Sequence, residues 1–281
     1  MRQRTNRGRS TSRGIASRYR GRHTHVMSGP YHRPRADRVL VCEASDFAGA
    51  AARHVASVVQ GAVRARGRCA LALTGGSTPR PIYELMAVPP IVGSISWDRV
   101  DIYFGDERCV PPDDQASNYR MAHEALLQHV LTPGTSVHRM EGERTDREAA
   151  ARDYARLLPA RLDVLLLGMG EDGHTASLFP HSPALRESAR KVVPASGPEP
   201  EPLRLTITPP VIADAETVIV VVAGSAKAGA VALALEGPYQ PEQLPIQFAL
   251  SGTWFVDHPA AGALRGHSLA GAEHNVTGTG R

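Results

Sequence analysis

The stretch from residue 162 to residue 180 constrains this chain more than any other. It begins with Leu-Asp-Val-Leu-Leu-Leu, in which five of six residues are apolar, and then enters a segment with three glycines. A short apolar run that ends in glycines predicts a buried β-strand followed by a tight turn. The turn also carries polar side chains, namely Asp172, His174, Thr175 and Ser177. Because open α/β sheets bind ligands at the carboxyl ends of their strands, the stretch predicts a functional site.

Strand-like and helix-like patterns alternate along most of the chain. This alternation predicts an α/β fold with a doubly wound, mostly parallel sheet and helices on both faces, which is Rossmann-like. We expect residues 38–265 to form a single α/β domain. The expected strands are residues 38–42, 69–73, 97–104, a short one near 137, 162–167, 203–208, 217–222 and 253–256. The expected helices are residues 45–66, a segment from after Pro79 to about 86, 117–130, 146–158, 225–235 and about 259–264.

Residues 1–37 differ from the rest of the chain in composition. Together with Arg38 they contain eleven arginines and one acid, Asp37, so this end has a charge of about +10. Since the whole chain carries +4, the remaining residues are mildly acidic, at about −6. A segment rich in Arg, Ser, Gly and His without an apolar period cannot bury enough surface to offset its chain entropy. We therefore expect a disordered Arg-rich tail.

Three explanations of this tail remain open. It fits a nucleic-acid-binding arm, an organellar transit peptide, or an assigned start that lies upstream of a true start at Met27. We expect no specific nucleic-acid partner. Residues 266–281 are expected to form a flexible C-terminal tail, and the proline-rich residues 194–202 a surface loop.

Composition also argues against membrane, disulfide and metal-binding classes. No run approaches 18 uninterrupted apolar residues and no apolar signal segment is present, so we expect no membrane association and a cytoplasmic protein. The cysteines at 42, 69 and 109 have no CxxC spacing, which indicates reduced thiols. His181 follows His174 by seven residues with no third ligand in register, so no metal site is expected.

Three further polar segments follow expected strands. Residues 74–79, Thr-Gly-Gly-Ser-Thr-Pro, offer backbone N–H groups and hydroxyls to a phosphate, but they lack the lysine of a P-loop. Arg108 suits a phosphate, and Asp106 suits a base or a sugar hydroxyl. Lys227 and Arg204 could also bind an anion. Taken singly, each of these groups fits an ordinary structural role at least as well, and for residues 106–108 and Lys227 that role is favoured.

His174 is the one histidine among twelve that lies in a glycine turn after a buried strand. A neutral imidazole is suited to taking a proton from water near neutral pH. A lone histidine is more often structural, but the convergence of several polar loops favours a catalytic role here. Asn118, which follows Ser117, fits part of a helix N-cap as well as a ligand-binding role.

At these residues the chain resembles the 6-phosphogluconolactonase family of the glucosamine/galactosamine-6-phosphate isomerase superfamily. The resemblance spans about residues 39–264 in the family's order, and residues 168–180 are its most specific part. It is carried by residues 74–79, 106–108, 117–118, 168–180 and 204–208, with Gly224 and Lys227.

The resemblance implies hydrolysis of 6-phospho-D-glucono-1,5-lactone to 6-phospho-D-gluconate, in the oxidative branch of the pentose phosphate pathway. It implies an ester hydrolase without cofactor or metal, acting on a small sugar-phosphate lactone as a monomer or small homo-oligomer. His174 would be the general base that activates water, and Asp106 would hold the substrate or the base. Arg108 and Lys227 would hold the phosphate, with Arg204 as a helper. The other substrate-binding residues implied are Thr74, Gly75, Gly76, Ser77, Thr78, Asn118 and Gly173.

Two rival functions remain. The related glucosamine-6-phosphate deaminases typically have Asn at the position of Asp172, an Ile-Ala-Phe-Asn run after the histidine and Tyr at the position of Arg108. The residues in this chain favour the lactonase at all three places. The second rival is a catalytically silent sugar-phosphate-binding regulator whose arginine tail contacts nucleic acid.

The chain departs from the family pattern at two proline-containing segments. The pair Pro209-Pro210 is unusual, and we expect it to alter the next turn. The segment Pro245-Ile246-Gln247 replaces a Pro-Ala-like start of the final element, which puts the packing at the substrate edge in doubt.

Overall fold

The computed structural model describes residues 38–200 and 202–265. The expectations for residues 1–37 and 266–281 lie outside the described residues and stay predictions. The strands are β1 (Arg38–Cys42), β2 (Cys69–Leu73), β3 (Val100–Phe104), β4 (Asp106–Arg108), β5 (Ser136–Val137), β6 (Val164–Leu167), β7 (Val192–Ser196), β8 (Leu203–Ile207), β9 (Thr217–Val222) and β10 (Thr253–Asp257). The helices are α1 (Ala44–Arg66), α2 (Arg80–Met86), α3 (Asn118–Ala122), α4 (Gln128–Val130), α5 (Arg147–Leu157), α6 (Pro209–Asp214), α7 (Ala228–Glu236) and α8 (His258–Ala261).

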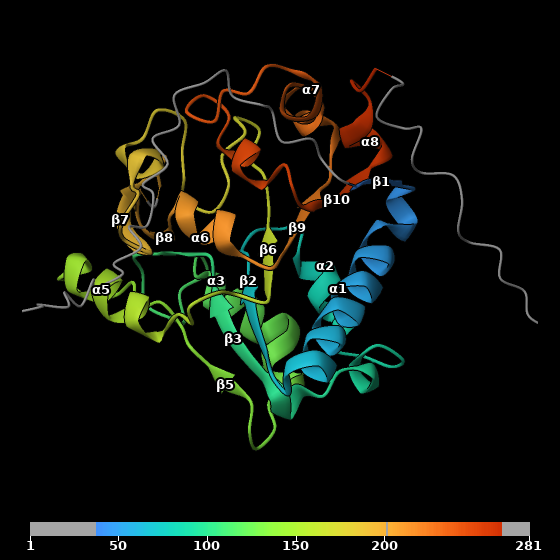
Figure 1. Ribbon diagram of the computed structural model, residues 1–281, viewed down its shortest axis with the longest axis vertical. Helices are drawn as coiled ribbons and strands as arrows, with labels where there is room; N and C mark the ends of the chain where they lie inside the picture. The colour runs from blue at the N-terminus through green and yellow to red at the C-terminus, as the bar shows by residue number, and fades with distance from the viewer. Residues whose placement is uncertain (1–37, 201, 266–281) are drawn as a thin grey trace, which may run out of the picture. The chain divides into compact units, whose positions relative to one another are not determined.

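The main sheet has seven strands in the order β1-β10-β9-β6-β2-β3-β5, and every neighbouring pair is parallel (Figure 1). The chain adds β3 and β5 on one side of β2, and it adds β9 and β10 on the far side of β6. The winding direction therefore reverses between β2 and β6. In doubly wound sheets such a switch point opens a crevice at the carboxyl ends of the two strands, where ligands bind.

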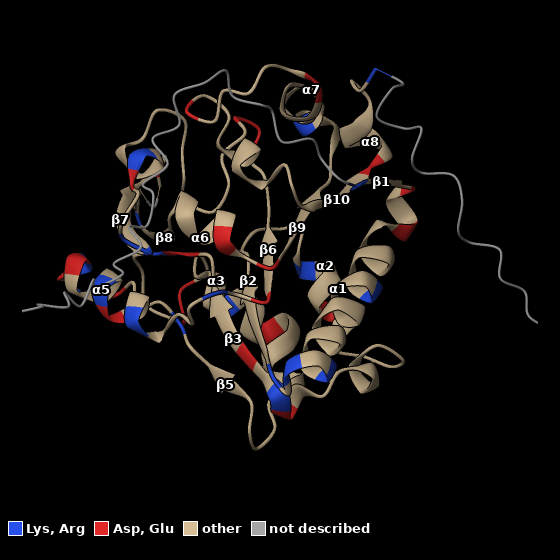
Figure 2. Ribbon diagram, in the orientation of Figure 1, with Lys and Arg blue, Asp and Glu red and all other residues tan. Residues whose placement is uncertain are grey.

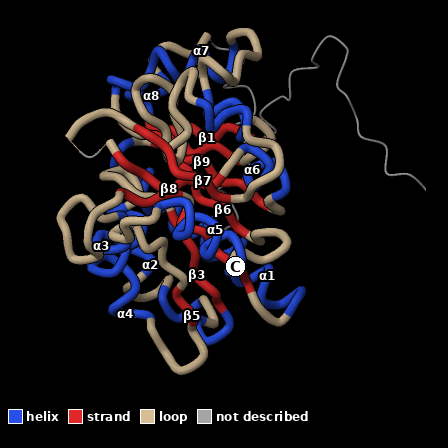
Figure 3. The backbone as a smooth tube through the Cα atoms, turned by 90° about the vertical axis from the view of Figure 1, so that its left-hand side faces the viewer, coloured by secondary structure: helices blue, strands red, loops and turns tan. Residues whose placement is uncertain are grey.

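Both faces of this sheet are buried. In β6, Leu165 and Leu167 belong to one cluster of buried residues, whereas Val164 and Leu166 belong to a second cluster with α1. Figure 3 shows strands running through the middle with helices on either side. Charged residues gather on helices and loops, whereas β6 and β9 carry none (Figure 2). This is the pattern of a parallel sheet covered on both faces, which confirms the predicted α/β class.

A second, three-stranded antiparallel sheet, in the order β4-β8-β7, corrects part of the prediction. We expected residues 106–108 and 194–202 to be loops, and residues 203–208 to continue the alternation, but the structure pairs β4 with β8 and β8 with β7. The chain leaves the main sheet at Gly105 and enters this sheet at once. Pro194 is tolerated in β7 because β7 is an edge strand, where a missing N–H breaks no inner ladder.

Smaller corrections concern the ends of elements. Residues 97–99 form a 3-10 turn instead of the start of a strand, and the expected helix 117–130 contains a π-helical segment over residues 123–127. The pair Pro209-Pro210 begins helix α6, where missing N–H groups would be unpaired in any case. Among the described residues, no helix is both long enough and apolar enough to cross a membrane.

Candidate active site

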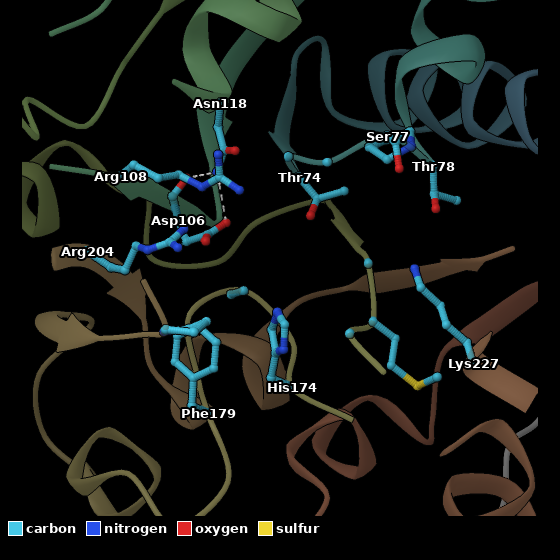
Figure 4. Close-up of a pocket in the computed structure, with 18 residues that line it drawn as sticks. Thr74, Ser77, Thr78, Asp106, Arg108, Asn118, His174, Phe179, Arg204 and Lys227 are labelled. Atoms are coloured by element: carbon cyan, nitrogen blue, oxygen red, sulfur yellow. Dashed lines mark hydrogen bonds between the residues drawn. The ribbon is translucent and has the colours of Figure 1, made fainter. Parts of the chain in front are cut away.

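A cavity of about 330 Å³ lies at the carboxyl ends of the strands that flank the switch point (Figure 4). Eleven of the twelve predicted site residues line it, and Gly173 does not. The residues lining it are Thr74, Gly75, Gly76, Ser77, Thr78, Pro79, Asp106, Arg108, Asn118, Gly168, Met169, Gly170, His174, Ala176, Phe179, Pro198, Arg204 and Lys227. The fold thus gathers segments that lie as far as 153 residues apart in the sequence, from Thr74 to Lys227.

His174 is paired with Asp172. Its Nδ1 lies 2.6 Å from Oδ1 of Asp172, and the same oxygen accepts the main-chain N–H of His174 at 3.1 Å. Burial raises the pKa of Asp172, but the hydrogen bonds from His174 outweigh it, so that pKa is lowered overall. An ionised carboxylate only accepts hydrogen bonds, so Nδ1 carries the ring hydrogen. Nε2 of the neutral imidazole is then the acceptor.

Glycines shape the turn around this histidine. A Cβ atom at Gly170 would collide with the imidazole, so the close approach requires glycine there. The N–H of Gly170 binds the carbonyl of His174 at 3.0 Å. Gly173 has a φ of 78°, and its carbonyl accepts the N–H of Ile246 at 2.9 Å. The predicted residue Gly173 therefore holds the turn in place and does not face the cavity.

The segment 245–247 supports the turn in spite of its unusual sequence. It lies in a 3-10 turn, Pro245–Ala249, and Gln247 is buried with 1% of its surface exposed. The side-chain amide of Gln247 donates to the carbonyl of Pro238 at 2.9 Å, and its oxygen accepts the N–H of Gln240 at 2.6 Å. The packing behind the turn is therefore ordered by a satisfied polar side chain.

Asp106 is buried and binds protein groups with both carboxylate oxygens. Ser177 Oγ donates to Oδ2 at 2.6 Å, and Asn118 Nδ2 donates to Oδ1 at 3.2 Å. These bonds tie β4 to α3 and to the turn that carries His174. Asp106 thus lines the cavity, while the carboxylate that accepts the hydrogen bond of the His174 imidazole is that of Asp172.

Glu107 was not among the predicted site residues, and it fixes the wall next to Asp106. Its carboxylate accepts the N–H groups of Arg108, Asn118 and Tyr119 and the hydroxyl of Ser117, at 2.7–3.0 Å. Burial raises its pKa in spite of these four donors. The result is a fixed start of α3, with the Asn118 side chain so close to Gly75 that a Cβ atom there would overlap it.

The cationic groups lie on two sides of the cavity. Arg108 and Arg204 are on one side and Lys227 is on the other, with His174 between them (Figure 4). Arg108 and Arg204 are directly opposite each other in the β4–β8 register, a placement that is unfavourable for like charges. Arg108 Nη1 donates to the carbonyl of Ala116, whereas its buried Nε has no hydrogen-bond partner among the described residues. An anion would relieve this arrangement.

Lys227 follows β9 in a short 3-10 turn, Ser225–Lys227. The turn begins at Gly224, whose φ is 100° and whose N–H is bound by both carboxylate oxygens of Asp257 at 3.0 Å. Burial lowers the pKa of Lys227, opposed by the charges of Glu171 and Asp257. Its ammonium group is thus partly desolvated at the edge of the cavity.

No group of three or more His, Cys, Asp or Glu residues suited to a metal ion occurs within the described part of the chain. A His–Asp pair, a glycine loop rich in donors and cationic side chains define an α/β protein with a switch-point site suited to a small anionic ligand. The comparison with known proteins agrees with this class of protein. The profile of the family described as glucosamine-6-phosphate isomerases/6-phosphogluconolactonase matches residues 43–256, and the chain belongs to this family.

Three individual proteins show how similar this chain is to known members of the family and of the fold. A 6-phosphogluconolactonase of Mycobacterium leprae is 39% identical over 244 residues, which cover 81% of this chain and 98% of the relative. The crystal structure of a 6-phosphogluconolactonase from Shewanella baltica has a TM-score of 0.70 at 29% identity, covering 78% of this chain and 96% of that one. A monomeric glucosamine-6-phosphate deaminase has a TM-score of 0.71 at 22% identity, covering 80% and 99%, which shows only that the fold is shared.

Sequence reasoning missed several residues of the site. Asp172 carried a signal, because it stands two positions before the histidine in the same turn. Phe179 packs its ring on the imidazole, with centroids 4.6 Å apart, but in the sequence it is an ordinary apolar residue. Pro198 lines the cavity from a segment that follows β7, and no local pattern marks it.

Proposed function

We propose that this protein hydrolyses 6-phospho-D-glucono-1,5-lactone to 6-phospho-D-gluconate, with His174 as the general base. The observation that carries the proposal is the His174–Asp172 pair in a cavity that also holds cationic side chains and the glycine loop. The similarity to 6-phosphogluconolactonases along four fifths of the chain supports it.

The reaction needs one base and no covalent intermediate. Nε2 of His174 takes a proton from water while the water oxygen attacks C1 of the lactone. The tetrahedral intermediate then breaks the bond between C1 and the ring oxygen, and the proton on the imidazole passes to that oxygen, which leaves as the C5 hydroxyl. A positioned general base contributes roughly 10²–10⁴ in rate, which is substantial for an activated ester. Asp172 stabilises the imidazolium that forms between the two proton transfers.

The oxyanion of the intermediate needs hydrogen-bond donors close to the base. We assign this task to main-chain N–H groups of the turn 168–173, of which residues 168–170 line the cavity. Asp106 acts on substrate binding through Ser177 and Asn118, whose positions it holds.

The phosphate is assigned to the loop 75–78 together with Lys227. This side of the cavity offers hydroxyls and main-chain N–H groups as well as a positive charge, a set of donors that suits a phosphate dianion. Arg108 also contributes charge to phosphate binding. Together with Arg204, it faces the substrate from the opposite side of His174.

A coupled assay tests the proposal. The lactone is generated from glucose 6-phosphate by its dehydrogenase, and formation of 6-phosphogluconate is followed against the spontaneous rate. We expect the protein to accelerate the reaction and to release no ammonia from glucosamine 6-phosphate. Ammonia release without lactone hydrolysis would assign the deaminase activity instead, and the absence of both activities would leave a binding protein.

A further inference from the structure

The strands β2 and β6 separate before they reach the site. They pair at Leu71 with Val164 and at Ala72 with Leu165, and this register does not continue beyond Ala72. On its other side β2 stays paired with β3, where the N–H of Gly105 binds the carbonyl of Leu73 at 2.9 Å. Successive residues of a strand present their N–H and C=O groups to alternate sides. The main-chain groups of Thr74 therefore face the gap between β2 and β6.

The hydroxyl of Tyr83 fills this gap. It accepts the N–H of Thr74 at 3.0 Å and donates to the carbonyl of the same residue at 2.9 Å. Tyr83 is fully buried in the core beneath the site, and both of these hydrogen bonds are buried. A buried N–H or C=O group that lacks a partner is strongly unfavourable. One hydroxyl thus replaces the strand that would otherwise pair with Thr74.

We propose that Tyr83 is a positioning residue whose hydroxyl keeps the end of β2 separate from β6 and so sets the loop 75–78 for phosphate binding. The inference rests on the proposed assignment of that loop to the phosphate. Without the hydroxyl, the main-chain N–H and C=O groups of Thr74 need other partners. The end of β2 then moves toward β6 or opens to water. Either change displaces the loop that follows it.

The chain contains a matched control on the opposite face of the sheet. The hydroxyl of Tyr154 in α5 accepts the N–H of Phe104 at 2.8 Å and donates to its carbonyl at 3.1 Å. Tyr154 is as deeply buried as Tyr83, but it supports the end of β3 beyond the short strand β5. Loss of this hydroxyl leaves the same unpaired groups at a strand end that leads to Asp106 and Arg108 and not into the loop 75–78.

The test compares Tyr83→Phe with Tyr154→Phe in the full chain. Affinity for inorganic phosphate is measured by calorimetry, together with thermal unfolding and with KM and kcat for the lactone. We expect both variants to unfold at lower temperature. Tyr83→Phe weakens phosphate binding about tenfold and raises KM by a similar factor at unchanged kcat, whereas Tyr154→Phe weakens phosphate binding distinctly less. Equal effects of the two variants on phosphate affinity, or no effect of Tyr83→Phe, would overturn the inference.

Two further outcomes separate this inference from the proposed activity. If the wild type binds phosphate but does not hydrolyse the lactone, the proposed function fails while the phosphate titration still decides the role of Tyr83. If Tyr83→Phe does not fold, amide hydrogen exchange of the wild type tests the hydrogen bond between Tyr83 and Thr74 instead. The N–H of Thr74 should then exchange as slowly as those of β2, and fast exchange at Thr74 would contradict the hydrogen bond on which the inference depends.

Discussion

The loop after β2 and the turn after β6 flank the same cavity, yet they differ in chemistry. The loop, residues 74–79, has no titratable side chain and offers hydroxyls and main-chain N–H groups. The turn, residues 168–178, carries His174 and Asp172 in direct contact. Because the switch point brings together two halves of the sheet, binding and proton transfer can reside on separate segments that meet only in the fold. Substitutions on the two segments should therefore affect different kinetic constants.

The largest expected effect belongs to the turn. His174→Ala should lower kcat by roughly 10²–10⁴ and leave KM little changed, because the base acts in the transition state and not in binding. His129→Ala, an exposed histidine in α4, is the control and should be silent. Steady-state kinetics in the coupled assay measure both variants. Turnover close to that of the wild type in His174→Ala would remove His174 as the base.

Asp172→Asn should lower kcat by about tenfold or more, but by less than His174→Ala. The amide keeps the shape of the carboxylate but lacks the charge that stabilises the imidazolium. Asp113→Asn, which removes an exposed carboxylate that lines no part of the cavity, serves as the control and should retain full kcat. An Asp172→Asn variant with unchanged kcat and raised KM would move this carboxylate from the chemistry to substrate binding.

On the binding side, Lys227→Ala should weaken the affinity for 6-phosphogluconate roughly 10- to 100-fold, the loss expected for one charged hydrogen bond. Hydrolysis of unphosphorylated glucono-1,5-lactone should not change, since that substrate lacks the group that Lys227 holds. Arg108→Ala should also chiefly raise KM. A loss with both substrates in Lys227→Ala would show that Lys227 does more than bind the phosphate.

The smallest expected effect is a dependence of binding on pH. Burial lowers the pKa of Lys227 from the ordinary value of 10.5, and only its protonated form attracts the phosphate. Affinity for 6-phosphogluconate should therefore decrease as pH rises through this lowered pKa, so the decrease begins at a lower pH than for an ordinary lysine. Calorimetry with Lys227→Arg provides the comparison, because a guanidinium stays charged. An equal decrease in Lys227→Arg would assign the effect to another group.

The sequence predicted the main sheet and eleven of the eighteen residues that line the cavity. Apolar runs such as residues 69–73 and 217–222 favour buried strands, and the polar segments that follow parallel strands meet at one edge of the sheet. The three-stranded sheet was missed because β4 is only three residues long and made of Asp, Glu and Arg. Its strand conformation comes from the hydrogen bonds to β8 and not from local preference.

The same distinction applies to the site. Residues 162–180 determine locally that a strand stops at a glycine turn and presents a histidine, because periodicity and glycine content act over a few residues. Tertiary structure decided which groups Asp106 binds, how Glu107 is buried and that the Tyr83 hydroxyl binds Thr74. Each of these contacts joins segments from different strands and helices. Such contacts depend on how elements pack, and packing is a property of the whole chain that no local pattern contains.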